Sequence, residues 1–501
     1  MSIFVRELLT AVKSLNIMTE FTYDLIVIGS GPAGQRAAIQ ASKLGKKIAL
    51  IEKKNVVGGV CTNTGTIPSK TLREAVMHLS GYRERSIYGS AYAVKQSVTM
   101  EDLLFRTNQV TRHEIDIIKH QLSRNGVELI SAKAALIDSH MVAASSESGE
   151  GQRILSTDKI VIATGTRATK DAGIPFDEQN VFTSDDILSI RSVPKSLVVV
   201  GAGVIGCEYA CMFATLGVRV TLIDKRERLL PFVDHEISDT LSYQLRQQRV
   251  ILRLGEEVSN LKVEQTETGL LASLNLKSGK KVTAEAVLYS IGRSGNTEDL
   301  NLEAVGLSAD DRGRIKVNSC YQTEVPNIYA VGDVIGFPSL ASTSMEQGRI
   351  AACNAFDHPY ISMPEYFPYG IYTIPEISMV GQTEEELTQA GVPYEMGRAA
   401  YREIARGQII GDQTGILKIL FHTETHRLLG VHILGEGASE LVHIGQAVMS
   451  LNGSIDYFIN SVFNFPTLAE CYKTAAFDGI NSLRHSPMVL EGNEQPVAET
   501  T

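Results

Sequence analysis

Residues 23–34, YDLIVIGSGPAG, indicate how this chain begins to fold. The first half is a largely apolar run, which is typical of a strand buried in a parallel sheet. The second half has the spacing G-x-G-x-x-G, and a helix-type segment at 35–45 and a second strand at 46–52 come next. The fingerprint therefore stands in the strand–helix–strand context that a dinucleotide-binding site requires.

Each glycine of the fingerprint has a physical task in that context. Gly29 is expected to make the tight turn, Gly31 to let a pyrophosphate approach the backbone, and Gly34 to pack the helix against the strand. The helix N-terminus offers unpaired N–H groups and a partial positive charge to the pyrophosphate. Glu52 ends the second strand, where its carboxylate can accept hydrogen bonds from ribose hydroxyls.

The same layout occurs a second time. LVVV at 197–200 runs into GAGVIG, a helix-type segment follows, and the next strand, 218–224, ends in an aspartate. The glycines of this repeat are Gly201, Gly203 and Gly206. Two dinucleotide sites argue against a simple dehydrogenase with one cofactor. We expect FAD in one site and a nicotinamide nucleotide in the other, because two flavins would leave no soluble reductant.

The end of the second repeat leaves the choice between NAD and NADP open. Asp224 suits the free ribose 2′-hydroxyl of NAD. However, Lys225, Arg226 and Arg228 follow at once, and guanidinium groups suit a 2′-phosphate. One interpretation is a site that tolerates both nucleotides, and the other is a solvated basic turn.

Three further segments are expected to complete the two nucleotide folds. Residues 159–165, KIVIATG, and 286–292, AVLYSIG, each read as a strand that ends in a small-residue turn and returns the chain to a neighbouring domain. Residues 327–333, NIYAVGD, run a buried strand into a Gly-Asp turn. Asp333 at its end can bind a ribityl hydroxyl.

The stretch GGVCTNTGTIPSK, residues 58–70, completes a set of ordered motifs with GSGPAG, ATG, GAGVIGCE and YAVGD. Together they resemble the two-dinucleotide flavoprotein disulfide reductases, such as dihydrolipoamide dehydrogenase, glutathione reductase and mercuric reductase. The resemblance covers roughly residues 21–485. The chain is similar to the transhydrogenase branch of that family, which also has one cysteine and a threonine five residues on. Segments 339–352, 438–447 and 463–470 also look like that branch.

Two departures from the disulfide reductases agree with each other. Thr66 stands where those enzymes carry the second cysteine that resolves a mixed disulfide. Phe465 replaces the histidine of an H-P-T-x-x-E segment that the partner subunit supplies, and phenylalanine cannot take a proton. The resemblance then implies reversible ping-pong hydride transfer from NADPH to FAD and from the reduced flavin to NAD⁺ in one pocket.

The resemblance also implies roles for three catalytic candidates. Lys70 is the cation beside flavin N5, and Glu208 is the carboxylate that pairs with this lysine, with an ordinary exposed helical acid as the alternative. Cys61 lies against the flavin, either as a remnant of the redox pair or as a low-pKa thiolate.

The cofactors expected are FAD, NAD⁺/NADH and NADP⁺/NADPH, with no metal. The residues expected to bind them are Gly29, Gly31, Gly34, Glu52, Lys53, Gly59, Cys61, Thr66, Lys70, Ala163, Thr164, Gly165, Gly201, Gly203, Gly206, Asp224, Lys225, Arg226, Gly292, Arg293, Asp333, Leu340 and Ala341. Cys207 and Cys211 lie one helical turn apart without a His or Cys cluster nearby, so we expect them in the core.

The fold class expected is α/β, with two Rossmann-like domains, for FAD and NAD(P), and a C-terminal α+β dimerisation domain that makes a homodimer. The expected boundaries are an N-terminal extension at 1–20, an FAD domain at 21–165 and 288–365, an NAD(P) domain at 166–287, a dimerisation domain at 366–485 and a flexible tail at 486–501. In the dimerisation domain the pattern predicts strands at 369–381, 415–421 and 428–435 and helices at about 383–391, 438–450 and 467–484.

The composition excludes several classes of function. A formal net charge of −10 gives no overall attraction for nucleic acid or an anionic membrane, and no run approaches the ~20 apolar residues of a membrane-spanning helix. Six cysteines without a C-x-x-C pair fit a reducing cytoplasm. The alternatives to a transhydrogenase are a flavin-dependent disulfide, metal or quinone reductase and a non-catalytic flavin-bound redox sensor.

Overall fold

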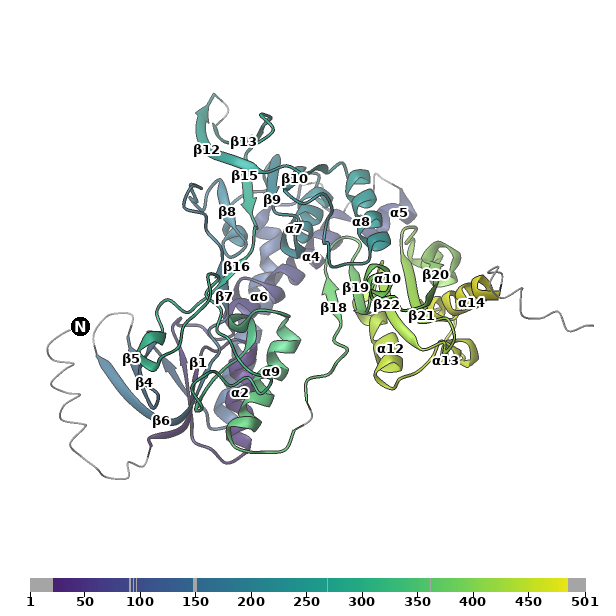
Figure 1. Cartoon of the computed structure of the whole chain (residues 1–501). Helices are drawn as coiled ribbons and strands as arrows, with labels where there is room; N and C mark the ends of the chain where they lie inside the picture. The colour runs from purple at the N-terminus through teal and green to yellow at the C-terminus, as the bar shows by residue number, and fades with distance from the viewer. Residues whose placement is uncertain are drawn as a thin grey trace, which may run out of the picture. The chain divides into compact units, whose positions relative to one another are not determined.

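The computed structural model describes residues 21–484 except 90, 91, 93, 96, 147–150, 268 and 361. The predicted N-terminal extension and the predicted flexible tail lie outside the described residues. The chain forms two compact units (Figure 1). Among the described residues, the first unit comprises 21–59, 115–166 and 295–362, and the second comprises 60–114, 167–294 and 363–484.

The first unit is built on a parallel sheet, as the apolar runs predict. Its strands lie in the order β3, β2, β1, β6, β17, and all four pairings are parallel. These strands are β3 (Glu128–Ser131), β2 (Ile48–Glu52), β1 (Tyr23–Ile28), β6 (Gln152–Ile162) and β17 (Ile328–Ala330). The first half of β6 instead pairs antiparallel with the hairpin of β4 (Lys133–Asp138) and β5 (Met141–Ser145).

Two helices of the first unit, α2 (Pro32–Lys43) and α9 (Ala341–Ala355), pack side by side (Figure 1). Their backbones approach closely because Gly348 has no side chain: a Cβ there would lie 2.1 Å from the carbonyl oxygen of Ala33. The helices and the sheet share one apolar core, and a second core covers the opposite face of the sheet. A sheet buried on both faces explains why β1 and β2 are apolar almost throughout.

The second unit repeats this architecture. Its five-stranded sheet has the order β11, β10, β9, β15, β8, again with every pairing parallel. The strands are β11 (Ile251–Leu254), β10 (Arg219–Asp224), β9 (Ser196–Val200), β15 (Ala286–Tyr289) and β8 (Val181–Thr183), and the helices that follow β9 and β10 are α7 (Val204–Thr215) and α8 (His235–Gln247). An antiparallel sheet of β12 (Val258–Thr266), β13 (Gly269–Leu276) and β14 (Lys281–Ala284) extends from it.

An antiparallel sheet forms the C-terminal part of the second unit, with the order β18, β19, β22, β21, β20 (Figure 1). Its strands are β18 (Tyr369–Ile371), β19 (Ile377–Gly381), β22 (Leu428–Leu434), β21 (Ile416–His422) and β20 (Tyr394–Ala400). The helices are α10 (Glu384–Ala390), α11 (Ala405–Ile410), α12 (Ala438–Ser450), α13 (Asp456–Asn460) and α14 (Glu470–Arg484).

The structure corrects two sequence predictions for this part and adds one strand. The strand predicted at 369–381 is two antiparallel strands, because residues 372–376 turn the chain back between β18 and β19. The helix predicted at 467–484 starts only at Glu470, since Pro466 and the turn that follows it precede the helix. Strand β20 was not predicted, since its sequence, YEMGRAA, lacks the apolar alternation of a strand.

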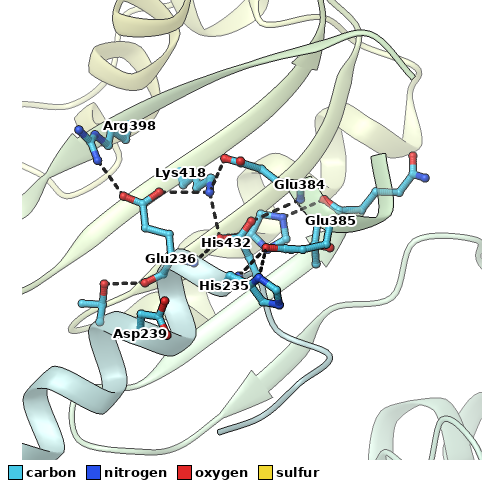
Figure 2. Close-up of polar contacts among 12 residues, drawn as sticks. His235, Glu236, Asp239, Glu384, Glu385, Arg398, Lys418 and His432 are labelled. Carbon is cyan, nitrogen blue, oxygen red and sulfur yellow. Dashed lines mark hydrogen bonds and ion pairs between the residues drawn. The ribbon is translucent and has the colours of Figure 1, made fainter. Parts of the chain in front are cut away.

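A buried polar cluster joins α8 to the C-terminal sheet (Figure 2). Lys418 on β21 has a side chain that is 2% exposed, and its Nζ lies 2.9 Å from Oδ1 of Asp234, 3.1 Å from Glu236 and 2.6 Å from Glu384. Asp234 also caps α8 by accepting a hydrogen bond from the backbone N–H of Glu236. One lysine therefore fixes the start of α8 against the sheet.

Candidate functional site

The first fingerprint has the close backbone approach that its glycines predict. Gly29 has a φ of +106°, and a Cβ on it would lie 2.4 Å from the carbonyl oxygen of Ala163, at the end of β6. A Cβ on Gly34 would lie 1.9 Å from the carbonyl oxygen of Gly29. By contrast, a Cβ on Gly31 would meet no described atom within 4 Å outside its own stretch of chain, which leaves room for a pyrophosphate before the N-terminus of α2.

The turn at Gly58 and Gly59 adds a second wall to this space. The backbone N–H of Gly58 donates to the carbonyl oxygen of Ser30 at 3.2 Å, and a Cβ on Gly59 would lie 3.0 Å from Cα of Gly31. The start of the 58–70 stretch is thus packed on the first fingerprint. Any larger residue at position 59 would push against the backbone on which the pyrophosphate is expected to rest.

Glu52 is held in place by the fingerprint itself. Its Oε2 accepts hydrogen bonds from the backbone N–H and the hydroxyl of Ser30, at 3.0 and 2.6 Å, and its Oε1 accepts one from the N–H of Lys54. The carboxylate is 8% exposed, and the neighbouring Lys53 is exposed. Each oxygen of a carboxylate can accept two hydrogen bonds, so Oε2 is fully used and Oε1 can still accept one from a ribose hydroxyl.

The other predicted residues of the first unit lie on two loops. Asn296 bonds to the carbonyl oxygens of Thr164 and Gly165, at 3.0 Å each. The hydroxyl of Thr164 is buried and lacks a hydrogen-bond partner within the described part of the chain, as expected of a group that awaits a ligand. Asp333 accepts hydrogen bonds from the hydroxyls of Thr166, at 3.3 Å, and Ser344, at 3.5 Å.

Leu340 and Ala341 form the cap and the first residue of α9, the helix on which Ser344 lies. The predicted residues of the first unit therefore supply glycines without side-chain obstruction, a helix N-terminus, an orphaned hydroxyl and two carboxylates. These groups fit FAD.

The second fingerprint reproduces the geometry of the first. Gly201 has a φ of +105°, and a Cβ on it would lie 2.4 Å from the carbonyl oxygen of Ser290, which follows β15. A Cβ on Gly206 would lie 1.8 Å from the carbonyl oxygen of Gly201, while the Cβ position of Gly203 has no described atom within 4 Å. Ser290 after β15 thus takes the place that Ala163 takes after β6.

The acid at the end of the second repeat is engaged by a basic neighbour. Asp224 accepts a hydrogen bond from the N–H of Ala202, as Glu52 does from Ser30, but Nε and Nη2 of Arg226 also donate to its two oxygens at 2.9 and 2.7 Å. Burial opposes the ionisation of Asp224, but the hydrogen bonds from Arg226 and Ala202 outweigh it and lower the pKa of the carboxyl group. The side chain of Arg226 is 42% exposed.

The remaining basic residues of this turn differ in their contacts. Nη1 of Arg228 lies 2.7 Å from Oδ1 of Asp239 on α8 and so faces away from the acid at the strand end, whereas Lys225 is exposed. Gly292 accepts a hydrogen bond from the N–H of Thr169, and Arg293 pairs with Asp185 at 2.7 Å.

Lys70 and Glu208 form an ion pair within the second unit. Lys70 lies on α4 (Thr66–Ser80) and Glu208 on α7, and the lysine Nζ is 3.0 and 2.8 Å from the two carboxylate oxygens. The side chain of Glu208 is 4% exposed and that of Lys70 is 27% exposed. The alternative of an ordinary exposed helical acid at Glu208 is therefore wrong, because this carboxylate is buried and paired.

Sequence reasoning missed one residue at this pair. The backbone N–H of Tyr372 donates to Oε1 of Glu208 at 2.9 Å, and Nζ of Lys70 lies 4.9 Å from the centre of the Tyr372 ring. The signal was hidden because residues 369–381 read as one strand, in which Tyr372 is an ordinary β-forming residue.

The remaining predicted residues of the 58–70 stretch lie on two short helices. Cys61 is partly exposed on α3 (Gly59–Asn63), and Thr66 is exposed at the first position of α4. The turn between the helices is tight, since the N–H groups of Thr64 and Gly65 both donate to the carbonyl oxygen of Val60.

Cys207 and Cys211 lie in the apolar core, both with an exposure of 0%. Burial raises the pKa of the Cys211 thiol to about 12, so this group stays protonated at neutral pH. A thiol that does not ionise is a poor metal ligand and a poor nucleophile. The structure thus gives this cysteine a packing role.

Comparisons with known proteins agree with this geometry. Residues 23–348 match the family model described as pyridine nucleotide-disulphide oxidoreductase, and residues 367–476 match its dimerisation domain. A soluble pyridine nucleotide transhydrogenase of Mycobacterium bovis (strain BCG / Pasteur 1173P2) is 52% identical over 92% of this chain and 98% of its own length. A soluble pyridine nucleotide transhydrogenase of Colwellia psychrerythraea is 49% identical over 92% of this chain and 99% of its own length.

Solved structures are also similar. LpdA from Mycobacterium tuberculosis has a TM-score of 0.83 at 25% identity, covering 90% of this chain and 99% of its own. The HOCl-induced flavoprotein disulfide reductase RclA from Escherichia coli has a TM-score of 0.80 at 27% identity, covering 91% and 99%. With its two dinucleotide fingerprints and its C-terminal sheet domain, the chain belongs to the pyridine nucleotide-disulphide oxidoreductase family.

Proposed function

We propose that the protein is an FAD-dependent NAD(P)⁺ transhydrogenase that moves a hydride reversibly between NADPH and NAD⁺. Bound FAD would supply a ring that accepts a hydride from one nucleotide and returns it to the other. The observation that carries the proposal is Thr66: where disulfide reductases place the resolving cysteine, this chain has a hydroxyl that cannot form a disulfide. The relatives at 52% and 49% identity bear the transhydrogenase name.

Some of the predicted site residues bind the two nucleotides, and one supplies a positive charge at the flavin. The fingerprint at Gly29–Gly34 and the Glu52 carboxylate hold FAD, and the repeat at Gly201–Gly206 holds the nicotinamide nucleotide. Lys70, which is paired with Glu208, would present a positive charge to the ring of bound FAD. No residue needs to take up a proton, which agrees with phenylalanine at position 465.

The chain is proposed to act as a homodimer in the cytoplasm, with the expected domain boundaries. The match to the family's dimerisation domain supports the dimer. Val462 and Phe465, between α13 and α14, are 94% and 74% exposed, and apolar side chains exposed to this degree suit burial by a second copy. In the part of the chain that the structure describes, no helix is long and apolar enough to cross a membrane.

Initial-rate kinetics test the proposal. With NADPH and NAD⁺ varied together and no thiol present, we expect parallel double-reciprocal lines, the pattern of two half-reactions that share one site. We also expect no turnover with lipoamide or glutathione disulfide. Turnover of a disulfide at a rate equal to or above that with NAD⁺ would favour the disulfide-reductase alternative.

Replacing Cys61 with serine is expected to leave at least a third of the transhydrogenase activity. The reason is that neither a second thiol at position 66 nor a histidine at position 465 is present to support thiol chemistry. The activity is measured per bound FAD, so that weaker flavin binding is not mistaken for slower chemistry. Complete loss of turnover in a fully loaded Cys61→Ser protein would give the thiol a chemical role.

Replacing Arg226 with alanine is expected to weaken NADP⁺ binding roughly 10- to 100-fold, the range for a hydrogen-bonded charge. NAD⁺ binding should change less than threefold, because Asp224 remains to accept hydrogen bonds from the ribose. Titration calorimetry of the oxidised protein measures the dissociation constants for NADP⁺ and NAD⁺. Arg228→Ala is the matched control, since Arg228 pairs with Asp239 on α8 and not with Asp224 at the end of the strand. Equal losses for both nucleotides in Arg226→Ala would contradict a contact between Arg226 and the 2′-phosphate of NADP⁺.

A further inference from the structure

The connection between β18 and β19, residues 372–376, lies against the Lys70–Glu208 pair. The backbone N–H of Tyr372 donates to Oε1 of Glu208 at 2.9 Å. The ring of the same residue faces Lys70, with Nζ 4.9 Å from its centre. The ammonium group of Lys70 therefore has a two-oxygen carboxylate contact and an aromatic ring as its neighbours.

We propose that Tyr372 is a positioning residue for hydride transfer. Its N–H sets the orientation of the Glu208 carboxylate, and its ring face holds the Lys70 ammonium through a cation–π contact. Burial raises the pKa of the Tyr372 hydroxyl, so the ring is a neutral phenol at neutral pH. Tyr372 lies within the segment that matches the dimerisation domain, so this domain contributes to the reaction site of its own chain as well as to dimerisation. The inference rests on the proposed function of Lys70.

The connection is fixed by the same helix that carries Lys70. Nε of Arg73, three residues further along α4, donates to the carbonyl oxygen of Thr373 at 3.0 Å, and its Nη2 lies 3.8 Å from Oε2 of Glu376. Residues three apart lie on one face of a helix, so Lys70 and Arg73 meet the connection together. The Arg73 side chain is 4% exposed, which makes this anchor a buried one.

A second anchor comes from α8. Nε2 of Gln248, at the end of that helix, donates to the carbonyl oxygen of Ile374 at 3.0 Å. With Thr373 and Ile374 both held by side chains, Tyr372 cannot shift far from the ion pair. The long side chain of Lys70 is thereby restricted to few rotamers, which reduces the entropy lost when the ammonium is held at the reacting ring.

The variants Tyr372→Phe and Tyr372→Leu test the ring. Phenylalanine retains the ring face and leucine removes it, while both retain the backbone N–H. In the FAD-loaded protein, we expect Tyr372→Phe to match the wild type within twofold in the limiting rate constant for reduction by NADPH. We expect Tyr372→Leu to be about tenfold slower. The dissociation constant for NADPH should stay within twofold in both, since Tyr372 acts on Lys70 and not on the nucleotide.

The flavin reduction potential gives a readout that is independent of turnover. A cation fixed beside the reduced ring stabilises its added charge, so the potential of Tyr372→Leu should be more negative than that of the wild type, while Tyr372→Phe should not shift. If Tyr372→Leu equals the wild type in rate constant and potential, the proposal is wrong. It is also wrong if Tyr372→Phe and Tyr372→Leu slow flavin reduction equally. The loss would then not come from removal of the aromatic ring.

A double-mutant cycle separates positioning from a general structural defect. In a Lys70→Met background, Tyr372→Leu should have no further effect on the reduction rate, because the group that it positions is gone. A further tenfold loss in that background would show that Tyr372 acts elsewhere. These outcomes do not depend on NAD⁺ as the acceptor. Failure of the reduced wild type to pass a hydride to NAD⁺ would overturn the proposed function alone.

Discussion

Replacing Lys70 with methionine is expected to slow the reduction of bound FAD by NADPH by a factor of about 100 or more. Methionine has a similar length and no charge, so the variant removes the ammonium and leaves the shape of the side chain. Preorganised charges at the place where charge develops in a reaction typically contribute factors of this size. Glu208 and Tyr372 fix this ammonium before the substrate arrives, so no energy is spent on its reorientation during the reaction.

Stopped-flow absorbance of the flavin measures the rate constant, and titration with NADP⁺ measures nucleotide binding, which should change little. Lys119→Met is the control, because Lys119 is an exposed lysine on α6 (Met100–Arg124). It should match the wild type in both measurements. A Lys70→Met protein that binds FAD and is reduced as fast as the wild type would remove Lys70 from the mechanism.

Replacing Lys418 with methionine is expected to lower the free energy of unfolding by about 3–5 kcal/mol, as when one partner of a buried ion pair is removed. Asp234 is 0% exposed and would stay in the core without its cation. Asp234 caps α8, so its carboxylate could reach water only by giving up the hydrogen bond that it accepts from the N–H of Glu236. Arg398→Met is the matched control: it also removes a cation from Glu236, but at a side chain that is 54% exposed. There the loss should be ~1 kcal/mol or less.

The destabilisation by Lys418→Met should depend on pH in a defined direction. Burial opposes the ionisation of Asp234, but the charges of His432 and Lys418 and the hydrogen bonds from Lys418 and the N–H of Glu384 outweigh it, so the pKa of Asp234 is lowered in the folded protein. The ionised Asp234 carboxylate therefore contributes to the free energy of unfolding above its unfolded-state pKa of about 3.9. This contribution is lost as pH falls through the pKa of Asp234 in the folded protein.

The lysine shows the opposite dependence. Burial favours the neutral amine of Lys418, but the carboxylates of Glu384 and Asp234 outweigh it and raise the pKa of Lys418. The charged Lys418 therefore contributes to the free energy of unfolding below about pH 10. This contribution is lost as pH rises through the pKa of Lys418 in the folded protein. Urea unfolding of both proteins should therefore show the largest difference between about pH 5 and pH 9, and a difference that grows below pH 4 would contradict the assignment.

The architecture was predictable where a local sequence pattern is compatible with only one kind of secondary structure. The runs before Gly29 and Gly201 could form only buried strands that lead into a tight turn, and both do. Helix α12 begins and ends at the predicted residues, 438 and 450. The equivalence of the segments that end at 165 and 292 was also visible in the sequence, and the packing of Ala163 and Ser290 on the two fingerprints agrees with it.

The candidate site was predictable only in part, because contacts between distant residues leave no local pattern. The Lys70–Glu208 pair was inferred from resemblance alone, and the hydrogen bond from Tyr372 was missed since a five-residue reversal inside an apolar run looks like a continuous strand. The hydrogen bonds from Arg226 to Asp224 were missed for another reason. A basic residue two positions after an acid can face a ligand or the acid, and only the folded turn decides between them.

We propose that one pocket delivers a hydride to the flavin and removes it again without thiols. Double-mixing stopped flow tests it directly: the oxidised protein is first mixed anaerobically with one equivalent of NADPH and then with excess NAD⁺. We predict that the flavin absorbance is lost in the first step and returns in the second, with one NADH formed per flavin, at rates sufficient for steady-state turnover. A flavin that stays reduced with NAD⁺ and is reoxidised only when a disulfide is added would contradict the claim.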